Sequence, residues 1–269
     1  MHKAHANGLK VPALCFRYGT RASSASGAFL YTEGEIKMTY YVDTAKYQPN
    51  DLSTYKKAGA SGSIVQITVG SSIRAPKGGH QIHSAHLLGL HRLFYHYACF
   101  GHSVNQAVKE AKFACKTAKD YGYKTIHIFC DWEGQDNDTS GSVSQNTEAI
   151  LAFMREIRKE GFTPGLYSSA SLLRTKINIK PIIKEFGTCL WVASYPYSGA
   201  TNDADMRYFP SMDGVCLWQF TDNWRGLNVD CSKVVYDPFK LKKKTKPEVA
   251  KVTRETYEIT GENIKIKKV

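Results

Sequence analysis

Features of several common protein classes are missing from this sequence. No apolar run approaches the roughly 18 residues of a membrane-spanning helix, so we expect no membrane insertion. The seven cysteines are an odd number, widely spread and without a CxxC pair, which excludes a small disulfide-bonded scaffold. The nucleotide-binding pattern GxGxxG and the P-loop pattern are absent as well. Hydrophobic residues nevertheless make up 42% of the 269 positions, which excludes a disordered chain.

The charge of the chain is unevenly distributed. It has 36 Lys and Arg against 24 Asp and Glu, for a net charge of +12. Residues 1–37 hold five basic and two acidic residues, residues 239–269 hold ten and four, and the body, residues 38–238, holds 21 and 18. A protein that acts on nucleic acid would usually carry its basic residues on the folded body. We therefore expect no nucleic-acid partner.

The N-terminal flank, residues 1–37, shows neither the alternation of a strand nor the stripe of an amphipathic helix. No apolar stretch of about 7–15 residues follows its early charges, so we expect no signal peptide. We interpret the flank as a disordered leader or a translated upstream segment. Purine-rich codons for residues 33–38 would form a bacterial ribosome-binding site just before a start codon. Met38 is therefore our hypothesis for the natural start, which the N-terminal mass of the native protein tests.

The body alternates short apolar runs with helical patterns. Two long stretches, Val104–Tyr121 and Ser144–Glu160, place apolar residues on one stripe, and Leu172–Arg174 and Lys180–Phe186 indicate shorter helices. Eight runs are typical of strands: 40–42, 63–69, 93–98, 125–130, 163–167, 189–193, 215–220 and 227–229. Strands that alternate with helices predict a parallel sheet. Eight of them in about 200 residues predict an α/β fold, a TIM-like barrel that is irregular in its last third.

Acidic residues follow several of these strands, at the end where such barrels carry their functional groups. The strongest pattern is Asp131-Trp132-Glu133, directly after the fourth strand. Residues i and i+2 of a strand face the same side, so the two carboxyl groups are held together and their pKa values are forced apart. One carboxyl can then stay protonated while the other stays ionised, as glycoside hydrolysis requires.

Two further carboxylates, Asp43 and Asp230, end the first and last predicted strands, which are neighbours in a closed barrel. Each could instead cap a helix or a turn. Aromatic side chains gather at the same strand ends, either as plain core or as surfaces on which sugar rings stack: Tyr95, Tyr97, Trp132, Tyr167, Trp191, Tyr195 and Trp218.

Four competing sites are weaker. His80, His83 and His86 could bind a metal, but the spacing drifts around a helix and no HExxH is present, which favours a solvated His-rich loop or helix start. Cys99 and Cys130 could serve a Cys–His peptidase, but both end apolar strands, where an inert buried thiol is usual. A chitinase-like acidic series and a GxSxG serine elbow are both absent.

Seven short motifs follow one another along residues 40–236: Val42-Asp43 with Tyr47-Gln48, residues 94–98, residues 131–133, residues 165–168, residues 191–195, residues 217–221 and residues 228–230. In these motifs and their order the segment resembles glycoside hydrolase family 25, the Chalaropsis-type lysozymes of many bacteriophage endolysins. The resemblance implies an irregular (β/α)5β3 barrel. It also implies an N-acetylmuramidase that cuts the β-1,4 bond from N-acetylmuramic acid to N-acetylglucosamine, without cofactor or metal.

Carried onto this chain, the resemblance makes Glu133 the general acid. Asp131 would stabilise developing positive charge or orient the 2-acetamido group of the substrate, and Asp43 and Asp230 would line the floor of the site. The route by which configuration is retained, an oxazolinium or an enzyme nucleophile, stays open. Thr44-Ala45-Lys46 departs from the family pattern and puts the detail of the subsite in doubt. The expected sugar-binding side chains are Tyr95, Tyr97, Tyr167, Trp191, Tyr195 and Gln219.

The resulting expectation is a monomeric lytic enzyme of a phage or prophage that acts on bacterial peptidoglycan. Without a signal peptide it would be made in the host cytoplasm and reach the wall with the help of a holin. The alternative is a wall-glycan-binding protein that cuts nothing. Residues 239–269 form a short basic C-terminal linker and tail, either frayed or the remnant of a wall-binding module, and could bind teichoic acids.

Overall fold

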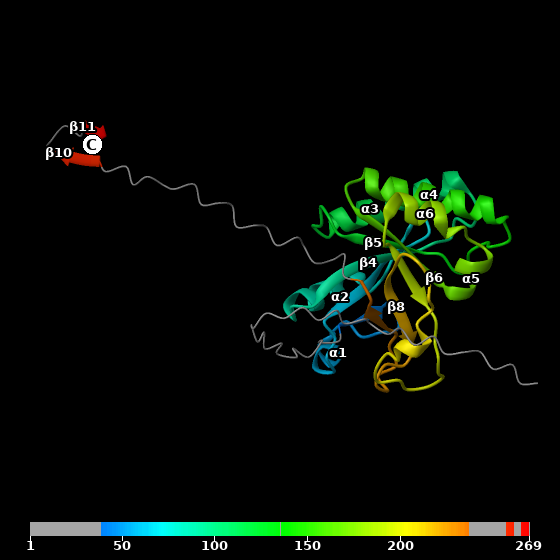
Figure 1. Ribbon diagram of the computed structural model, residues 1–269. Coiled ribbons are helices and arrows are strands. Elements are labelled where there is room, and N and C mark those ends of the chain that lie inside the picture. The colour runs from blue at the N-terminus through cyan, green and yellow to red at the C-terminus, as the bar shows by residue number, and fades with distance from the viewer. Residues whose placement is uncertain (1–38, 135, 237–256, 261–264, 269) are drawn as a thin grey trace, which may run out of the picture. The chain divides into compact units, whose positions relative to one another are not determined.

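Eight strands of this protein close into a barrel with helices around its outside (Figure 1). The computed structural model describes residues 39–134, 136–236, 257–260 and 265–268. The predicted leader and start at Met38 lie outside these residues, as does most of the basic tail. In barrel order the strands are β1 (Tyr40–Thr44), β2 (Gly62–Val69), β4 (His91–Tyr97), β5 (His127–Asp131), β6 (Thr163–Ser169), β7 (Leu190–Ala193), β8 (Val215–Thr221) and β9 (Cys231–Val234).

The pairing of the strands confirms the predicted (β/α)5β3 barrel. Neighbouring strands from β1 to β8 run parallel, whereas β9 is antiparallel to both β8 and β1 and closes the barrel between them. The short β3 (Ile73–Arg74) extends β2 at its outer end. Five strand–helix units are therefore followed by β7, β8 and β9, which have no α-helix between them.

The eighth strand was predicted in the wrong place. Residues 227–229 lie in a tight turn, in which Trp224 N–H donates to Val229 O at 2.9 Å. Arg225, Gly226 and Asn228 have φ values of 55°, 74° and 49°. This left-handed backbone cannot continue an extended strand, so β9 begins only at Cys231.

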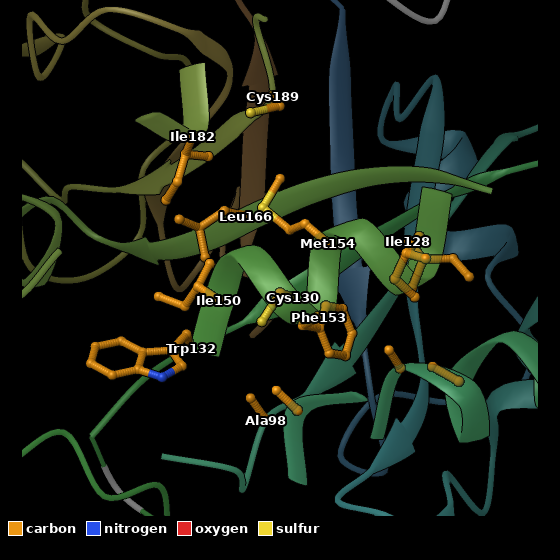
Figure 2. Packing of buried hydrophobic residues seen from close by; sticks show 14 of the residues in the cluster. Ala98, Ile128, Cys130, Trp132, Ile150, Phe153, Met154, Leu166, Ile182 and Cys189 are labelled. Atoms are coloured by element: carbon orange, nitrogen blue, oxygen red, sulfur yellow. The ribbon is translucent and has the colours of Figure 1, made fainter. Parts of the chain in front are cut away.

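The two long predicted helices are confirmed as α3 (Val104–Asp120) and α4 (Val143–Lys159). Serines cap their N-termini, and Ser142 forms a capping box with Gln145. The buried face of α4 covers β5 and β6, where Ile150, Phe153 and Met154 pack in the same cluster as the outward side chains of those strands (Figure 2). Burying such side chains contributes about 1.5–3 kcal/mol each. The two shorter predicted helices are α5 (Ala170–Thr175) and α6 (Ile179–Phe186).

Two helices were not predicted. One is the short α1 (Ser53–Lys57), and the other is α2 (Gly78–Leu87), which carries the histidine series. In α2 the side chains of Gln81, Ile82 and Ala85 are buried, whereas His80, His83 and His86 are exposed.

The interior of the barrel is filled by aromatic and aliphatic side chains from alternate strand positions, among them Tyr41, Leu93, Phe129, Trp191 and Leu217. Two glycines make room for the rings. A Cβ on Gly165 would lie 2.4 Å from the ring of Phe129, and a Cβ on Gly62 would lie 2.7 Å from the ring of Tyr41. In the part of the chain that the structure describes, the packed interior leaves a pocket at the mouth of the barrel.

In the C-terminal flank, β10 (Tyr257–Thr260) pairs antiparallel with β11 (Lys265–Lys268). These short strands lie in the flank for which the sequence left open a frayed tail or the remnant of a wall-binding module. None of the helices in the described ranges combines the length and apolar character that crossing a membrane requires.

Candidate active site

A pocket of about 400 Å³ opens where the parallel strands end. Its lining includes all four carboxyl groups expected from the sequence: Asp43, Asp131, Glu133 and Asp230. Five of the six expected sugar-binding residues line it as well: Tyr95, Tyr97, Tyr167, Trp191 and Gln219. Tyr195 stands beside the pocket, where its hydroxyl donates to Gln219 Oε1 at 2.6 Å.

Asp131, the last residue of β5, and Glu133, two residues beyond the strand, both lie on the pocket side. Trp132, between them, points outward, where it is fully buried against the helix layer and donates from Nε1 to Gly101 O at 3.0 Å. Its backbone N–H donates to Tyr167 O at 3.0 Å, and its carbonyl accepts from Ser168 Oγ at 2.7 Å. The indole and these bonds to β6 therefore hold the two carboxyl groups on the same side, as the i, i+2 spacing predicts.

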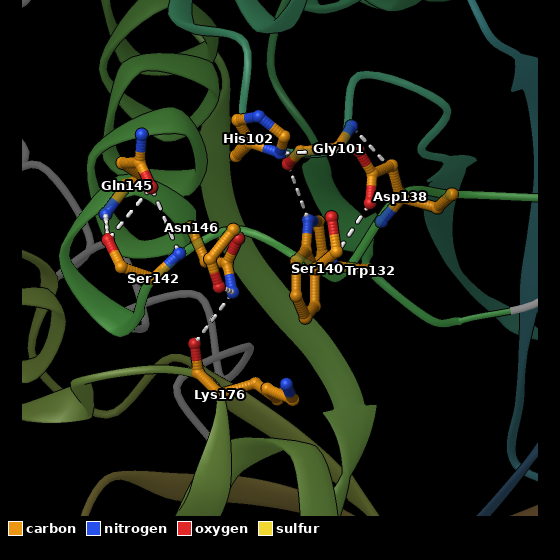
Figure 3. A network of polar contacts seen from close by, with 11 residues as sticks. Gly101, His102, Trp132, Asp138, Ser140, Ser142, Gln145, Asn146 and Lys176 are labelled. Carbon is orange, nitrogen blue, oxygen red and sulfur yellow. Dashed lines mark hydrogen bonds and ion pairs between the residues drawn. The ribbon is translucent and has the colours of Figure 1, made fainter.

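The segment that follows Glu133 is tied to the neighbouring loop and helix (Figure 3). Gly101 N–H donates to Asn137 Oδ1 at 2.6 Å, and Asp138 lies 3.5 Å from His102 Nδ1. Asn146 of α4 donates to Gly141 O and to Lys176 O, both at 3.1 Å. These contacts restrain the chain on the C-terminal side of Glu133 and so contribute to its placement.

Asp43, which is buried, and Asp230, which is half-buried, form a carboxyl pair. Asp43 N–H donates to Asp230 O at 3.1 Å, and the two side chains share a hydrogen bond. Burial and the neighbouring Asp230 charge raise the pKa of Asp43 well above its ordinary value, and burial raises the pKa of Asp230 to about 6. The pair therefore binds a proton at higher pH than two carboxyl groups in water would.

The position of Asp230 corrects one expectation. It precedes β9 and does not end a strand. Because β9 is antiparallel to its neighbours, its start lies at the edge where the parallel strands end. The predicted proximity of Asp230 to Asp43 is nevertheless what the structure has.

The other two carboxyl groups are also held away from water. Burial, followed by the charge of Glu133, raises the pKa of Asp131 well above its usual range. Burial raises the pKa of Glu133, while a hydrogen bond with Tyr167 opposes that shift. Asp131 Oδ1 is buried and has no hydrogen-bond partner among the described residues. Such an oxygen is costly to leave unpaired, so a donor that enters the pocket would complete its hydrogen bonding.

Several lining residues were not predicted as site residues: Ala45, Lys46, Tyr47, Gln48, Gln66, Val69, Ile73, Pro76 and Asp136. Tyr47 and Gln48 were recognised only as a matching motif. Tyr47 is 80% exposed, with Lys46 Nζ 5.0 Å from its ring centroid. Most of these residues lie in loops at the rim, where neither periodicity nor a strand end signals a role.

The competing sites find no support. Among the described residues, no group of three His, Cys, Asp or Glu side chains is placed to hold a metal ion. His96 faces away from the pocket and hydrogen-bonds Glu110 and Thr68. Cys130 is buried as expected, whereas Cys99 is exposed. Desolvation still raises the pKa of both thiols, the opposite of what an activated nucleophile needs.

Comparison with known proteins agrees with this geometry. The sequence model of glycosyl hydrolases family 25 matches residues 42–228. The chain belongs to this family.

Relatives within family 25 include lysozymes of bacteriophages. The chain is 45% identical to the lysozyme of Lactococcus phage mv1 over 179 residues, which is 65% of this chain and 88% of that protein. It is 31% identical to the lysozyme of Streptococcus phage Cp-7 over 188 residues, 70% of this chain and 52% of that protein. The chain thus spans about half of the longer phage lysozyme.

A solved structure of the modular Cpl-1 endolysin, a mutant in complex with a tetrasaccharide-pentapeptide, has a TM-score of 0.64 and 25% identity to this chain. The match covers 86% of this chain and 62% of the endolysin. A lysozyme from Streptomyces coelicolor shares the fold at a TM-score of 0.59 and 20% identity, with 76% of this chain and 94% of that chain covered.

Proposed function

We propose that this family 25 protein is a peptidoglycan hydrolase of the phage endolysin type, an N-acetylmuramidase that cleaves the β-1,4 bond from N-acetylmuramic acid to N-acetylglucosamine. The observation that carries the proposal is the convergence of four carboxyl groups in one pocket at the mouth of the barrel. The phage relatives are named lysozymes, and the Cpl-1 structure holds a peptidoglycan analogue. These findings give no support to the alternative of a barrel that only binds glycan.

Glu133 is the proposed general acid. Burial keeps its carboxyl protonated to higher pH than in water, so it can donate a proton to the oxygen of the departing sugar. The C–O bond to that oxygen then breaks with its electron pair. The positive charge that develops on the remaining sugar lies close to the other three carboxyl groups.

Asp131 is the proposed orienting group. Its unpaired Oδ1 is suited to accept the N–H of the 2-acetamido group, whose placement matters if that group assists the departure. Asp43 and Asp230 support the site from its floor as a pair that shares a hydrogen bond, and their partial charge favours a cationic transition state.

The aromatic walls are the proposed sugar-binding surface. Trp191 has its ring 4.2 Å from that of Tyr167 and 6.0 Å from that of Tyr95, and its Nε1 is fixed by Ser232 Oγ at 2.8 Å. Rigid rings present apolar faces on which pyranose rings stack at low entropic cost.

The sugar ends formed by the enzyme test the proposed bond. Purified peptidoglycan is digested with wild type and with Glu133→Gln, and the new reducing ends are identified after borohydride reduction. We expect reduced muramic acid from wild type and almost none from the variant. Reduced glucosamine would instead indicate a glucosaminidase, and new free amines would indicate a peptidase or amidase.

Localisation and further partners belong to the same proposal. The protein would act as a monomer at the bacterial wall, after holin-dependent release from the host cytoplasm. The basic residues 240–269 would add electrostatic attraction to teichoic acids.

Removing residues 240–269 tests the teichoic-acid contact. We expect weaker sedimentation with walls at low salt and unchanged cleavage of soluble glycan fragments, because screening weakens exposed charge pairs. Walls stripped of teichoic acids are the matched control. Equal binding of the full and shortened proteins to untreated walls would refute this role.

A further inference from the structure

A chain of hydrogen bonds crosses the floor of the pocket. Gln219 Oε1 accepts from two phenols, Tyr167 at 2.9 Å and Tyr195 at 2.6 Å. Gln219 Nε2 donates to Asp43 Oδ2 at 2.9 Å. The amide thereby joins side chains from β6, β8, β1 and the segment after β7, and both lone pairs of its oxygen are used.

The hydroxyl of Tyr167 is in contact with two acceptors. It donates to Gln219, and it also makes a hydrogen-bond contact with the carboxyl of Glu133. A phenol has a single hydrogen, so it can donate to only one of them at a time. When the hydrogen points to Gln219, Glu133 faces a phenol lone pair, which suits a protonated carboxyl that donates. When the hydrogen points to Glu133, it suits the ionised carboxylate.

We propose that Tyr167 is a positioning residue whose hydroxyl turns from Gln219 to Glu133 as Glu133 gives up its proton, and that Gln219 holds the hydroxyl in the first orientation beforehand. The step moves no other proton. The proton of Glu133 goes to the glycosidic oxygen, the C–O bond breaks toward that oxygen, and rotation of the hydroxyl supplies a hydrogen bond to the new carboxylate. Tyr195 stays on Gln219 Oε1 throughout, so the amide oxygen keeps a donor. The reaction it serves is the proposed glycosidic cleavage.

Other charged groups also face Glu133. The carboxyl groups are Asp43, Asp131, Asp136 and Asp230, the phenols besides Tyr167 are Tyr95, Tyr97 and Tyr195, and the cation is Lys46. Among the described residues, Tyr167 is the one with a hydrogen-bond contact to both Glu133 and Gln219. Variants at Tyr167 and Gln219 therefore distinguish the effect of the rotating Tyr167 hydroxyl from the effects of these other groups.

Substitutions of Tyr167 and of Gln219 should shift the pKa of Glu133 in opposite directions. Tyr167→Phe removes the donor to the carboxylate, so the pKa of Glu133 should rise by about one unit. Gln219→Met removes the acceptor that competes for the hydroxyl, so the hydrogen stays on Glu133 and its pKa should fall. Tyr195→Phe leaves Tyr167 as the sole phenol on Gln219, so the pKa of Glu133 should rise slightly.

The measurement is a ¹³C NMR titration of glutamate carboxyl groups, with Glu133 assigned by its absence in Glu133→Gln. Circular dichroism confirms folding of each variant, and exposed Tyr197→Phe is the control, expected to leave the titration unchanged. The basic limb of the pH–rate profile should move in parallel. If wild type releases no muramic acid ends, the proposed function fails. The titration would still show whether the Tyr167 hydroxyl and Gln219 control the pKa of Glu133.

The double variant decides whether Gln219 acts through Tyr167. Gln219→Met also removes a donor from Asp43, which could by itself lower the pKa of Glu133. In the Tyr167→Phe background we expect Gln219→Met to have no further effect. A shift that persists there, or shifts of the same sign in the two single variants, would overturn the proposal. Should Tyr167→Phe fail to fold, an unchanged pKa in both Gln219→Met and Tyr195→Phe would overturn it equally.

Discussion

Two buried acidic sites lie on opposite sides of the barrel wall and are built in opposite ways. Outside β4, Glu110 of α3 is completely buried and well partnered: its carboxyl accepts from His96 Nε2 and Cys99 N–H, both at 2.9 Å, and from Gln106 Nε2 at 3.2 Å. Inside the barrel, Asp131 is 6% exposed, yet one of its oxygens has no partner among the described residues.

This difference in hydrogen bonding distinguishes a carboxyl group that stabilises the fold from carboxyl groups that serve the reaction. The outer carboxyl has several donors, including His96, whose Nε2 must carry its hydrogen to face Glu110 and whose Nδ1 then accepts from Thr68 Oγ1 at 2.8 Å. The inner carboxyl groups have few donors. Burial raises their pKa values, and for Asp43 and Asp131 the neighbouring carboxyl charges add to that effect. An acid that must bind and protonate a substrate cannot have all its hydrogen bonds satisfied by its own fold.

The largest expected effect is on the rate. Glu133→Gln removes the proton donor, and we expect cleavage of soluble glycan fragments to fall by about 10²–10⁴-fold. Because burial disfavours the charged form of this carboxyl, its neutral replacement should leave the melting temperature unchanged or higher. If the variant lyses walls as fast as wild type, Glu133 is not the general acid.

The outer site should respond in the reverse sense. Glu110→Ala leaves His96 Nε2–H and Cys99 N–H without their acceptor, and we expect a loss of about 1–3 kcal/mol in the free energy of unfolding for each donor left unpaired. The rate per folded molecule should stay near that of wild type. Glu185→Gln on α6, whose partners Arg155 and Arg158 are half exposed, is the matched control and should cost less than about 1 kcal/mol.

The smallest expected effect is on the pH dependence of stability. The pKa of Asp230 is raised to about 6, so between pH 4 and 6 the folded chain binds a proton there that the unfolded chain has lost. This group therefore lowers stability as the pH rises through that window. The melting temperature of Asp230→Asn relative to wild type should increase from pH 4 to pH 7. A constant difference across this range would contradict the raised pKa of Asp230.

Regular periodicity made much of the fold predictable. The apolar stripes of α3 and α4 and the apolar runs of seven strands indicated an α/β barrel, because burial of one helix face or one strand leaves a repeating pattern. The turn at 224–229 was missed because its left-handed residues interrupt an apolar run that otherwise resembles a strand. Helix α2 was missed because exposed histidines give it little apolar contrast.

The candidate site also has features that the sequence predicted and features that it did not. The sequence alone determined that Asp131 and Glu133 share a side, since alternation is a local property of a strand. The closed barrel implied that Asp43 and Asp230 are neighbours. Only the tertiary structure decided that Gln219 joins Asp43 to two tyrosines, that Lys46 and Asp136 reach the rim, and that Glu110 is a buried structural acid. Those contacts join residues far apart in the chain, and hydrogen bonding, unlike periodicity, leaves no pattern in the sequence between them.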